Sequence, residues 1–205
     1  MSSYVEIANL AASKLGADDQ LRSPDDDTHV GRSVKAVWDT VRRAAIRDHT
    51  WNFAVQRQGL AARAGAPPHP WSFAYPLPAT SLRLVEVLNC RRRSDWQLEG
   101  RDILTHMAAP LHIRFLTDVR ETALWDDAFV EVFACRLAFQ IAMRITGDRG
   151  IRNDCWADYQ QALGRAIRAD ARENPPLRPE PTGWELARGW SGEPTRFSPN
   201  GDPVT

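Results

Sequence analysis

The feature that most constrains the fold is the stretch from residue 128 to residue 146, the most apolar in the chain. A helix of this composition is apolar on nearly every side and has to be covered by other elements over most of its surface. Asp126 and Asp127 precede the stretch as helix-start signals, and Gly147 follows it as a stop signal. The sequence therefore predicts a helix that ends near residue 146 and lies at the centre of a helical bundle.

Two helices are expected before it. Ser3 and Glu6 have the spacing of a capping box, and apolar residues then recur at helical spacing, which predicts a helix over residues 4–15. Ser23 followed by proline is typical of a helix start, and the apolar stripe that follows predicts a second helix ending near His49.

A fourth helix is expected over residues 150–172. Its apolar stripe is narrow and includes Trp156, Tyr159 and Leu163. We interpret this stripe as bundle core, and the alternative is a ligand pocket. Together these patterns predict a bundle of four helices.

Residues 52–121 lose the helical periodicity and favour strands. Residues 82–88 and 111–115 alternate in side-chain character, and residues 96–107 are typical of a hairpin around a glycine turn. We expect one small antiparallel sheet inserted between the helices. The predicted fold class is therefore α+β: mainly a four-helix bundle with an inserted sheet and an extended C-terminal arm.

The chain divides into four segments on this basis: residues 1–51 and 122–173 as the two halves of the bundle, 52–121 as the inserted β region, and 174–205 as the arm. The arm is proline-rich and has no periodicity, so it cannot build a core of its own. Its large aromatic residues are typical of anchors at a protein interface, which favours a docking arm over a disordered tail. These interface candidates are Trp184, Trp190 and Phe197.

Composition excludes several classes of protein. The 26 Lys and Arg residues equal the 26 Asp and Glu residues in number, which argues against a dedicated DNA-binding protein. Three cysteines without a C-x-x-C pair argue against a disulfide framework or a structural zinc site. The charged residues within 128–146 argue against a membrane span, and we expect no membrane partner. Eight tryptophans exceed what a core of this size requires, so we expect some at interfaces.

The acidic and histidine residues give little support for a metal or catalytic site. We interpret Asp25, Asp26 and Asp27 as charges at a helix start, with metal binding as the alternative. A metal pair of His106 and His112 across a hairpin is conceivable, but no ligand spacing supports it. We expect no catalytic residue, no metal and no cofactor.

Two further groups of residues are candidates for contact. Arg91, Arg92 and Arg93 form the densest cationic run, which we interpret as a solvated turn, with phosphate contact as the alternative. The chain also repeats Trp-x-Phe-Ala, first at 51–54 and then at 71–74. We expect the aromatic residues there to lock the sheet to the bundle: Trp51, Phe53, Trp71, Phe73 and Tyr75.

Five phrases occur in a fixed order along residues 4–172: "EIANLAASKLGA", "RSPDDD", "VWDTVRRAAIRDHTWNFA", "WSFAYPLPATSLRLVEV" and "FLTDV…WDDAFVEVFACRLAFQIAMRITGD". In this order they resemble the tail tubular protein A family, the head-to-tail adaptors (connectors) of short-tailed bacteriophages. The chain departs from the family mildly, with Thr50 in place of a usual proline and no aspartate near Ala79 or Thr80. Residues beyond 173 have no match in the resemblance.

The resemblance implies a structural protein of the virion tail, made in the cytoplasm of the host bacterium. It implies a ring of twelve copies that binds the portal protein above and the tail nozzle protein below. Genomic DNA would pass through the axial channel without specific recognition during ejection, and no enzyme activity is expected.

Two other classes of function stay open at this point. A phage tail-associated enzyme that degrades peptidoglycan would need a general acid, for which Glu131 or Glu99 are the candidates. A DNA-binding module would use the arginine run at 91–93.

Overall fold

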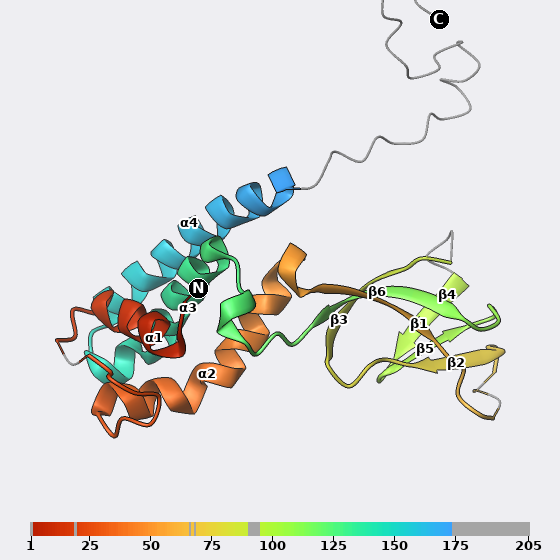
Figure 1. The fold of residues 1–205 in the computed structure, drawn as a ribbon, viewed down its shortest axis with the longest axis horizontal. Helices are drawn as coiled ribbons and strands as arrows, with labels where there is room; N and C mark the ends of the chain where they lie inside the picture. The colour runs from red at the N-terminus through yellow and green to blue at the C-terminus, as the bar shows by residue number, and fades with distance from the viewer. Residues whose placement is uncertain (1, 19, 66, 68, 90–94, 174–205) are drawn as a thin grey trace, which may run out of the picture. The chain divides into compact units, whose positions relative to one another are not determined.

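The computed structural model describes residues 2–18, 20–65, 67, 69–89 and 95–173. Met1–Arg172 form one compact unit. Within the described residues the chain is an α+β protein with four α-helices and six strands (Figure 1). The helices are α1 (Tyr4–Ser13), α2 (His29–Asp48), α3 (Asp127–Ile145) and α4 (Arg149–Glu173). The strands are β1 (Val55–Leu60), β2 (Phe73–Pro76), β3 (Ser81–Val87), β4 (Trp96–Glu99), β5 (Asp102–Thr105) and β6 (Leu111–Thr117), and the 3-10 turns are η1 (Asn52–Ala54) and η3 (Thr122–Leu124).

The start of α1 agrees with its sequence signal. The amide of Glu6 donates to the hydroxyl of Ser3 at 3.2 Å, and the amide of Ser3 donates to the carboxylate of Glu6 at 2.7 Å. The helix ends at Ser13, two residues before the expected end, and Gly16 follows with a φ of 68°. The predicted capping box is confirmed.

The expected start of the second helix at Ser23 is wrong. α2 begins at His29, and the hydroxyl of Thr28 caps it by accepting from the amide of Gly31 at 3.0 Å. The carboxylate of Asp26 instead accepts from the backbone amide of Ser23, which closes a separate turn before the helix. A side chain at Gly31 would collide with the backbone carbonyl of Asp26, so the glycine permits this turn to pack against the helix.

α3 is the central helix, as its composition predicts. Asp126 caps it, because its carboxylate accepts from the amides of Ala128 at 2.7 Å and Phe129 at 3.4 Å. Aromatic side chains of α2 and of the chain before α3 pack against it: the ring centroids of Trp38 and Phe133 are 4.8 Å apart, and those of Trp125 and Phe129 are 5.1 Å apart. The interpretation of Asp126 as a helix-end charge is confirmed.

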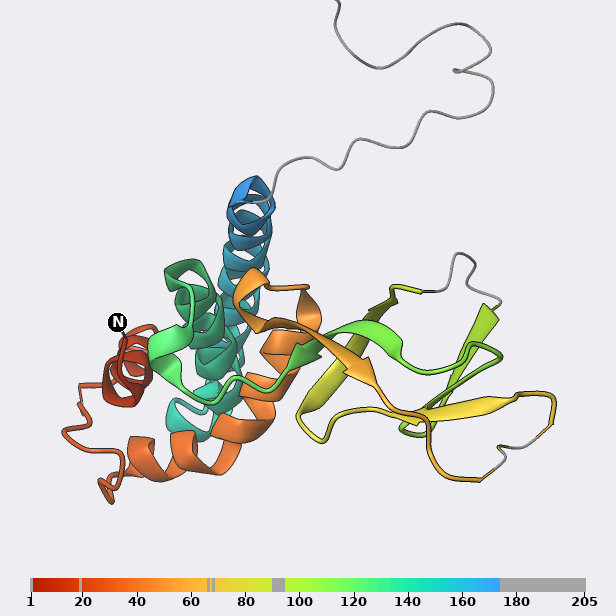
Figure 2. The ribbon, with the colours of Figure 1, turned by 45° about the vertical axis from the view of Figure 1, so that its right-hand side comes forward.

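The expected four-helix bundle is wrong. Close packing occurs among α1, α2 and α3, which lie beside one another (Figure 1 and Figure 2). α4 contributes a narrow line of buried residues to this core: Cys155, Tyr159, Ala162 and Ala166. Ile151 and the expected core residue Leu163 pack against it while partly buried. The expected core residue Trp156 is 44% exposed, whereas Tyr159 is buried as predicted. A stripe this narrow can hold a helix against one neighbour but cannot fill a fourth corner of a bundle.

The expected single sheet is wrong as well. The strands form two three-stranded antiparallel sheets, one in the order β1-β6-β3 and the other in the order β2-β5-β4. Both sheets contribute to a second hydrophobic core that is separate from the helical core: Leu60, Tyr75, Val87, Ile103, Leu111, Ile113 and Phe115. Alternate residues of β6 point into this core, and Leu116 packs with the helices instead.

Candidate functional site

The aromatic residues expected at one junction lie in two separate places. The indole of Trp51 is 1% exposed, packs edge-on against Phe129 with centroids 5.0 Å apart, and donates to the carbonyl of Ala45 at 3.1 Å. Phe53 packs on the same Phe129 ring at 4.9 Å. These two side chains therefore fasten the start of the β region to α3.

The aromatic residues of the second phrase belong to the β region alone. Phe73 and Tyr75 pack in the core between the two sheets. The hydroxyl of Tyr75 donates to the carbonyl of Met107 at 2.7 Å, and Trp71 lies beside the His106 ring with centroids 5.1 Å apart. The repeated phrase thus serves two cores and forms no joint site.

A buried arginine makes the strongest polar link between the helices and the sheets. The Arg42 side chain on α2 is 4% exposed and donates to both carboxylate oxygens of Asp118, from Nε at 2.9 Å and from Nη2 at 3.1 Å, while Nη1 donates to Asp39. Burial alone would lower the pKa of the Arg42 guanidinium, but the hydrogen bonds and charges of Asp118 and Asp39 outweigh it and raise this pKa. Arg42 lies four residues after Trp38 on the buried face of α2, and this position was the sequence signal that could have identified it.

Two polar clusters hold α4 in place. The amide of Asn52 donates to the carboxylate of Asp170 at 3.0 Å, and the His49 ring lies 3.1 Å from the same carboxylate. Nearer the middle of α4, the hydroxyl of Tyr159 bonds to Asp48, and Arg136 contacts both groups. Burial raises the pKa of the Tyr159 hydroxyl, and the nearby charge of Arg136 opposes that rise. These contacts add to the narrow apolar packing of α4.

An apolar patch is exposed on the outer side of α3 and α4. We call it the Trp156 patch and define it by Phe139, Met143 and Trp156. The rings of Phe139 and Trp156 have centroids 4.9 Å apart, Met143 lies one helical turn beyond Phe139, and the Arg152 guanidinium covers the Phe139 ring at 4.6 Å. Phe139 is partly buried against the helical core, whereas Met143 is 40% exposed and Trp156 is 44% exposed. An exposed tryptophan and an exposed methionine close together are typical of a surface that another chain covers.

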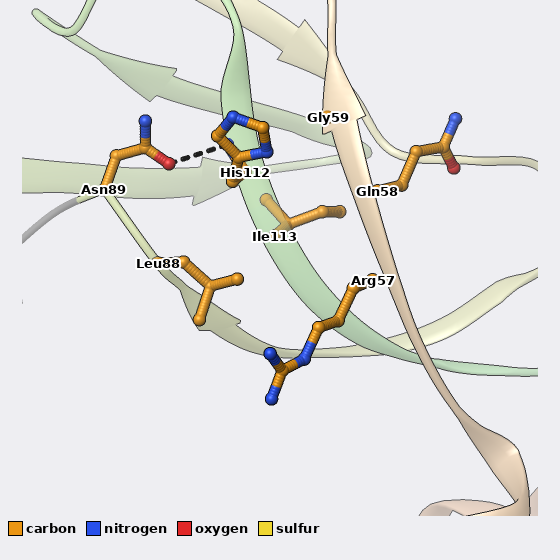
Figure 3. A pocket seen from close by; sticks show the side chains of 7 residues that line it. All are labelled: Arg57, Gln58, Gly59, Leu88, Asn89, His112 and Ile113. Carbon is orange, nitrogen blue, oxygen red and sulfur yellow. Dashed lines mark hydrogen bonds between the residues drawn. The ribbon is translucent and has the colours of Figure 1, made fainter.

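A hollow of about 450 Å³ lies over the outer face of the β1-β6-β3 sheet (Figure 3). The amide of His112 donates to the side-chain oxygen of Asn89 at 2.9 Å, and the amide of Leu88 donates to the carbonyl of His112 at 2.8 Å. A Cβ on Gly59 would lie 3.3 Å from the His112 ring, so glycine at this position lets the ring rest across the neighbouring strand. Arg57 completes the wall of the hollow on the β1 side.

The residues considered for catalysis or metal binding are dispersed. The His106 ring lies 3.0 Å from the Ser72 hydroxyl and beside Trp71, whereas His112 lines the sheet hollow. Glu131 pairs with Arg165 at 3.0 Å on the surface of the helices, and Glu99 lies on β4. Across the described parts of the chain, no three His, Cys, Asp or Glu side chains are grouped to hold a metal ion.

The two cysteines that the structure describes are buried and free. Burial raises the pKa of the Cys135 thiol and of the Cys155 thiol, which keeps both in the protonated form that packs as an apolar group. Cys135 is 1% exposed within the helical core.

The remaining predicted contact residues lie outside the described part of the chain. They are Arg91, Arg92 and Arg93, and the arm residues Trp184, Trp190 and Phe197. Among the described helices, none is long and apolar enough to cross a membrane. Comparison with protein-family models finds no matching family, and comparison with curated proteins finds no match either.

Proposed function

We propose that this chain is a head-to-tail adaptor of a short-tailed bacteriophage, a structural protein that forms a ring between the portal and the tail nozzle and leaves a channel for DNA. The observation that supports the proposal is the ordered set of phrases that resembles the tail tubular protein A family. The two most specific phrases contain Trp51, which fastens the β region to α3, and Tyr75, which is buried between the sheets. The resemblance therefore includes residues that hold together the helical part and the β part of the subunit.

The Trp156 patch supports a role for this subunit in assembly. A subunit in a closed ring contacts its two neighbours through two different surfaces, and each contact needs apolar anchors. An exposed tryptophan packed on a phenylalanine, with a methionine one turn away, has the chemistry of such an anchor. We assign the Trp156 patch to the contact between neighbouring copies.

The balance of acidic and basic residues in the chain supports a role as the wall of a DNA channel. Equal numbers of acidic and basic residues give a formal net charge of zero. Affinity for a DNA duplex depends on the number of phosphates that a protein neutralises, so a strongly basic wall would retain the DNA that has to move past it. A subunit with no net basic charge can neutralise few phosphates, so the duplex can still move past it.

Replacing Trp156 with alanine is expected to weaken ring formation on portal particles by about 2 kcal/mol per contact, because an exposed aromatic anchor is lost. The folded subunit should keep its thermal stability within a few degrees, since the side chain is 44% exposed. Co-sedimentation of the full-length chain with purified portal rings, titrated against subunit concentration, measures the change.

The matched control is Leu98→Ala, which removes an apolar side chain that is 42% exposed, close to the value for Trp156, and that lies on β4 rather than on α3 or α4. It should assemble like the unchanged chain. Equal assembly by Trp156→Ala and the unchanged chain would remove the patch from the interface.

A further inference from the structure

Two arginines face each other across neighbouring strands on the outer side of the β1-β6-β3 sheet. Arg57 on β1 and Arg114 on β6 are direct partners in the antiparallel register, so their side chains leave the same face of the sheet. Two like charges in this position repel each other and destabilise a sheet. An anion bound beside the pair would relieve that repulsion.

The carboxylates of the sheet neutralise this pair only in part. Glu86 is the partner of Arg114 on the third strand, and its carboxylate lies 3.8 Å from Nε of Arg114. That distance is too long for a hydrogen bond, and among the residues that the structure describes Nε of Arg114 has no other hydrogen-bond partner. Within the described residues Arg57 has no ion pair. One carboxylate therefore faces two guanidinium groups, and a positive charge is left over.

The surface beside this charge has room for a ligand. The hollow of about 450 Å³ borders Arg57, Gly59 and His112 (Figure 3). Gln58 also lines the hollow. The floor at Gly59 has no side chain, so a ligand can approach the strand backbone closely.

We propose that this face of the sheet binds phosphate oxygens of a nucleic-acid backbone through the guanidinium groups of Arg57 and Arg114. Guanidinium forks match phosphate geometry and bind it through two parallel hydrogen bonds. The hollow offers a surplus of positive charge with Leu88 as its exposed apolar residue, which suits a polyanion better than a protein interface that needs a buried apolar centre. The assignment to DNA rests on the proposed function, in which the genome passes each subunit.

The test uses the full-length chain and a short fluorescein-labelled DNA duplex, with binding followed by fluorescence anisotropy over a series of salt concentrations. Arg57→Gln and Arg114→Gln are each expected to weaken binding about threefold or more and to reduce the slope of log affinity against log salt by about one, independent of DNA sequence. Arg165→Gln is the matched control, because it removes an exposed arginine on the helices that pairs with Glu131. This control should leave the slope unchanged.

Circular dichroism guards against unfolding, and both sheet variants should melt no lower than the unchanged chain because they remove one of two like charges. Unchanged affinity and slope in Arg57→Gln and Arg114→Gln would overturn the proposal. Unlabelled duplex, inorganic phosphate and polyglutamate are compared as competitors at equal concentration of anionic groups. Stronger displacement by inorganic phosphate than by unlabelled duplex would assign the site to free phosphate, and displacement by polyglutamate equal to that by duplex would assign it to an acidic protein; either result overturns the nucleic-acid assignment.

The DNA-binding inference and the proposed adaptor role can be refuted independently. A chain that assembles on portal rings while both arginine variants bind DNA normally refutes this inference alone. A chain that does not bind portal refutes the adaptor role, whatever the anisotropy shows.

Discussion

Replacing Trp51 with alanine is expected to lower the free energy of unfolding by about 3–5 kcal/mol. The side chain is fully enclosed and packs edge-on against Phe129 of the central helix, so its removal leaves a cavity where the helical core meets the β region. It also removes the hydrogen bond from the indole to the carbonyl of Ala45. Urea unfolding followed by far-ultraviolet circular dichroism measures the loss.

Trp71→Ala is the matched control, because Trp71 begins the second copy of the same phrase. Its ring is only partly buried and packs beside His106, away from the two hydrophobic cores. We expect a loss of about 1 kcal/mol, the typical value for a substitution outside a core. Equal losses at the two tryptophans would contradict the assignment of Trp51 to the joint between helices and sheets.

Replacing Arg42 with methionine is expected to cost about 3–5 kcal/mol, because the change leaves the carboxylate of Asp118 without its main buried partner. The Asp118 side chain is 10% exposed, and its other ion pair is a longer one with the exposed Arg120 at 3.4 Å. The double variant Arg42→Met with Asp118→Leu should recover much of the loss, since no unpaired charge then remains.

Arg43→Met controls for the loss of an arginine on α2. Arg43 donates only to the backbone carbonyl of Asp39 at 3.3 Å, so we expect a change within about 0.5 kcal/mol. Thermal and urea unfolding of the unchanged chain, Arg42→Met, Asp118→Leu and the double variant form a double-mutant cycle, and Arg43→Met is measured beside them. A cost for Arg42→Met no greater than that for Arg43→Met would show that the buried pair does not link the helices to the sheets.

Local signals in the sequence were sufficient for the ends and centre of several helices. The Ser3 and Glu6 capping box and the Asp126 cap act within one turn of chain, so their spacing alone predicts them. The prediction of where α2 begins failed because two helix-start signals compete there. The sequence favours Ser23, but the carboxylate of Asp26 closes a turn that delays the helix until Thr28.

The arrangement of the elements depends on contacts between distant residues, which the sequence pattern does not contain. The stripe on α4 predicted an apolar face but not that Trp156 would stay outside the core. Alternation predicted strands, yet it did not predict that β2 pairs with β5 and β1 with β6 in separate sheets.

The same limit applies to the polar sites. Arg42 and Asp118 are 76 residues apart in the chain, and the opposition of Arg57 and Arg114 depends on the register of β1 and β6. Each arginine could be recognised as a candidate from its position, on a buried helix face or in an alternating strand. The partner of each arginine could not be recognised from the sequence.

The adaptor role is tested most directly by electron microscopy of the full-length chain mixed with the portal ring of the same phage. We predict an additional ring of density below the portal, continuous with it and open along the axis, with the same rotational symmetry from image to image. Portal particles without added density, with this chain recovered only in the unbound fraction, would contradict the proposed function.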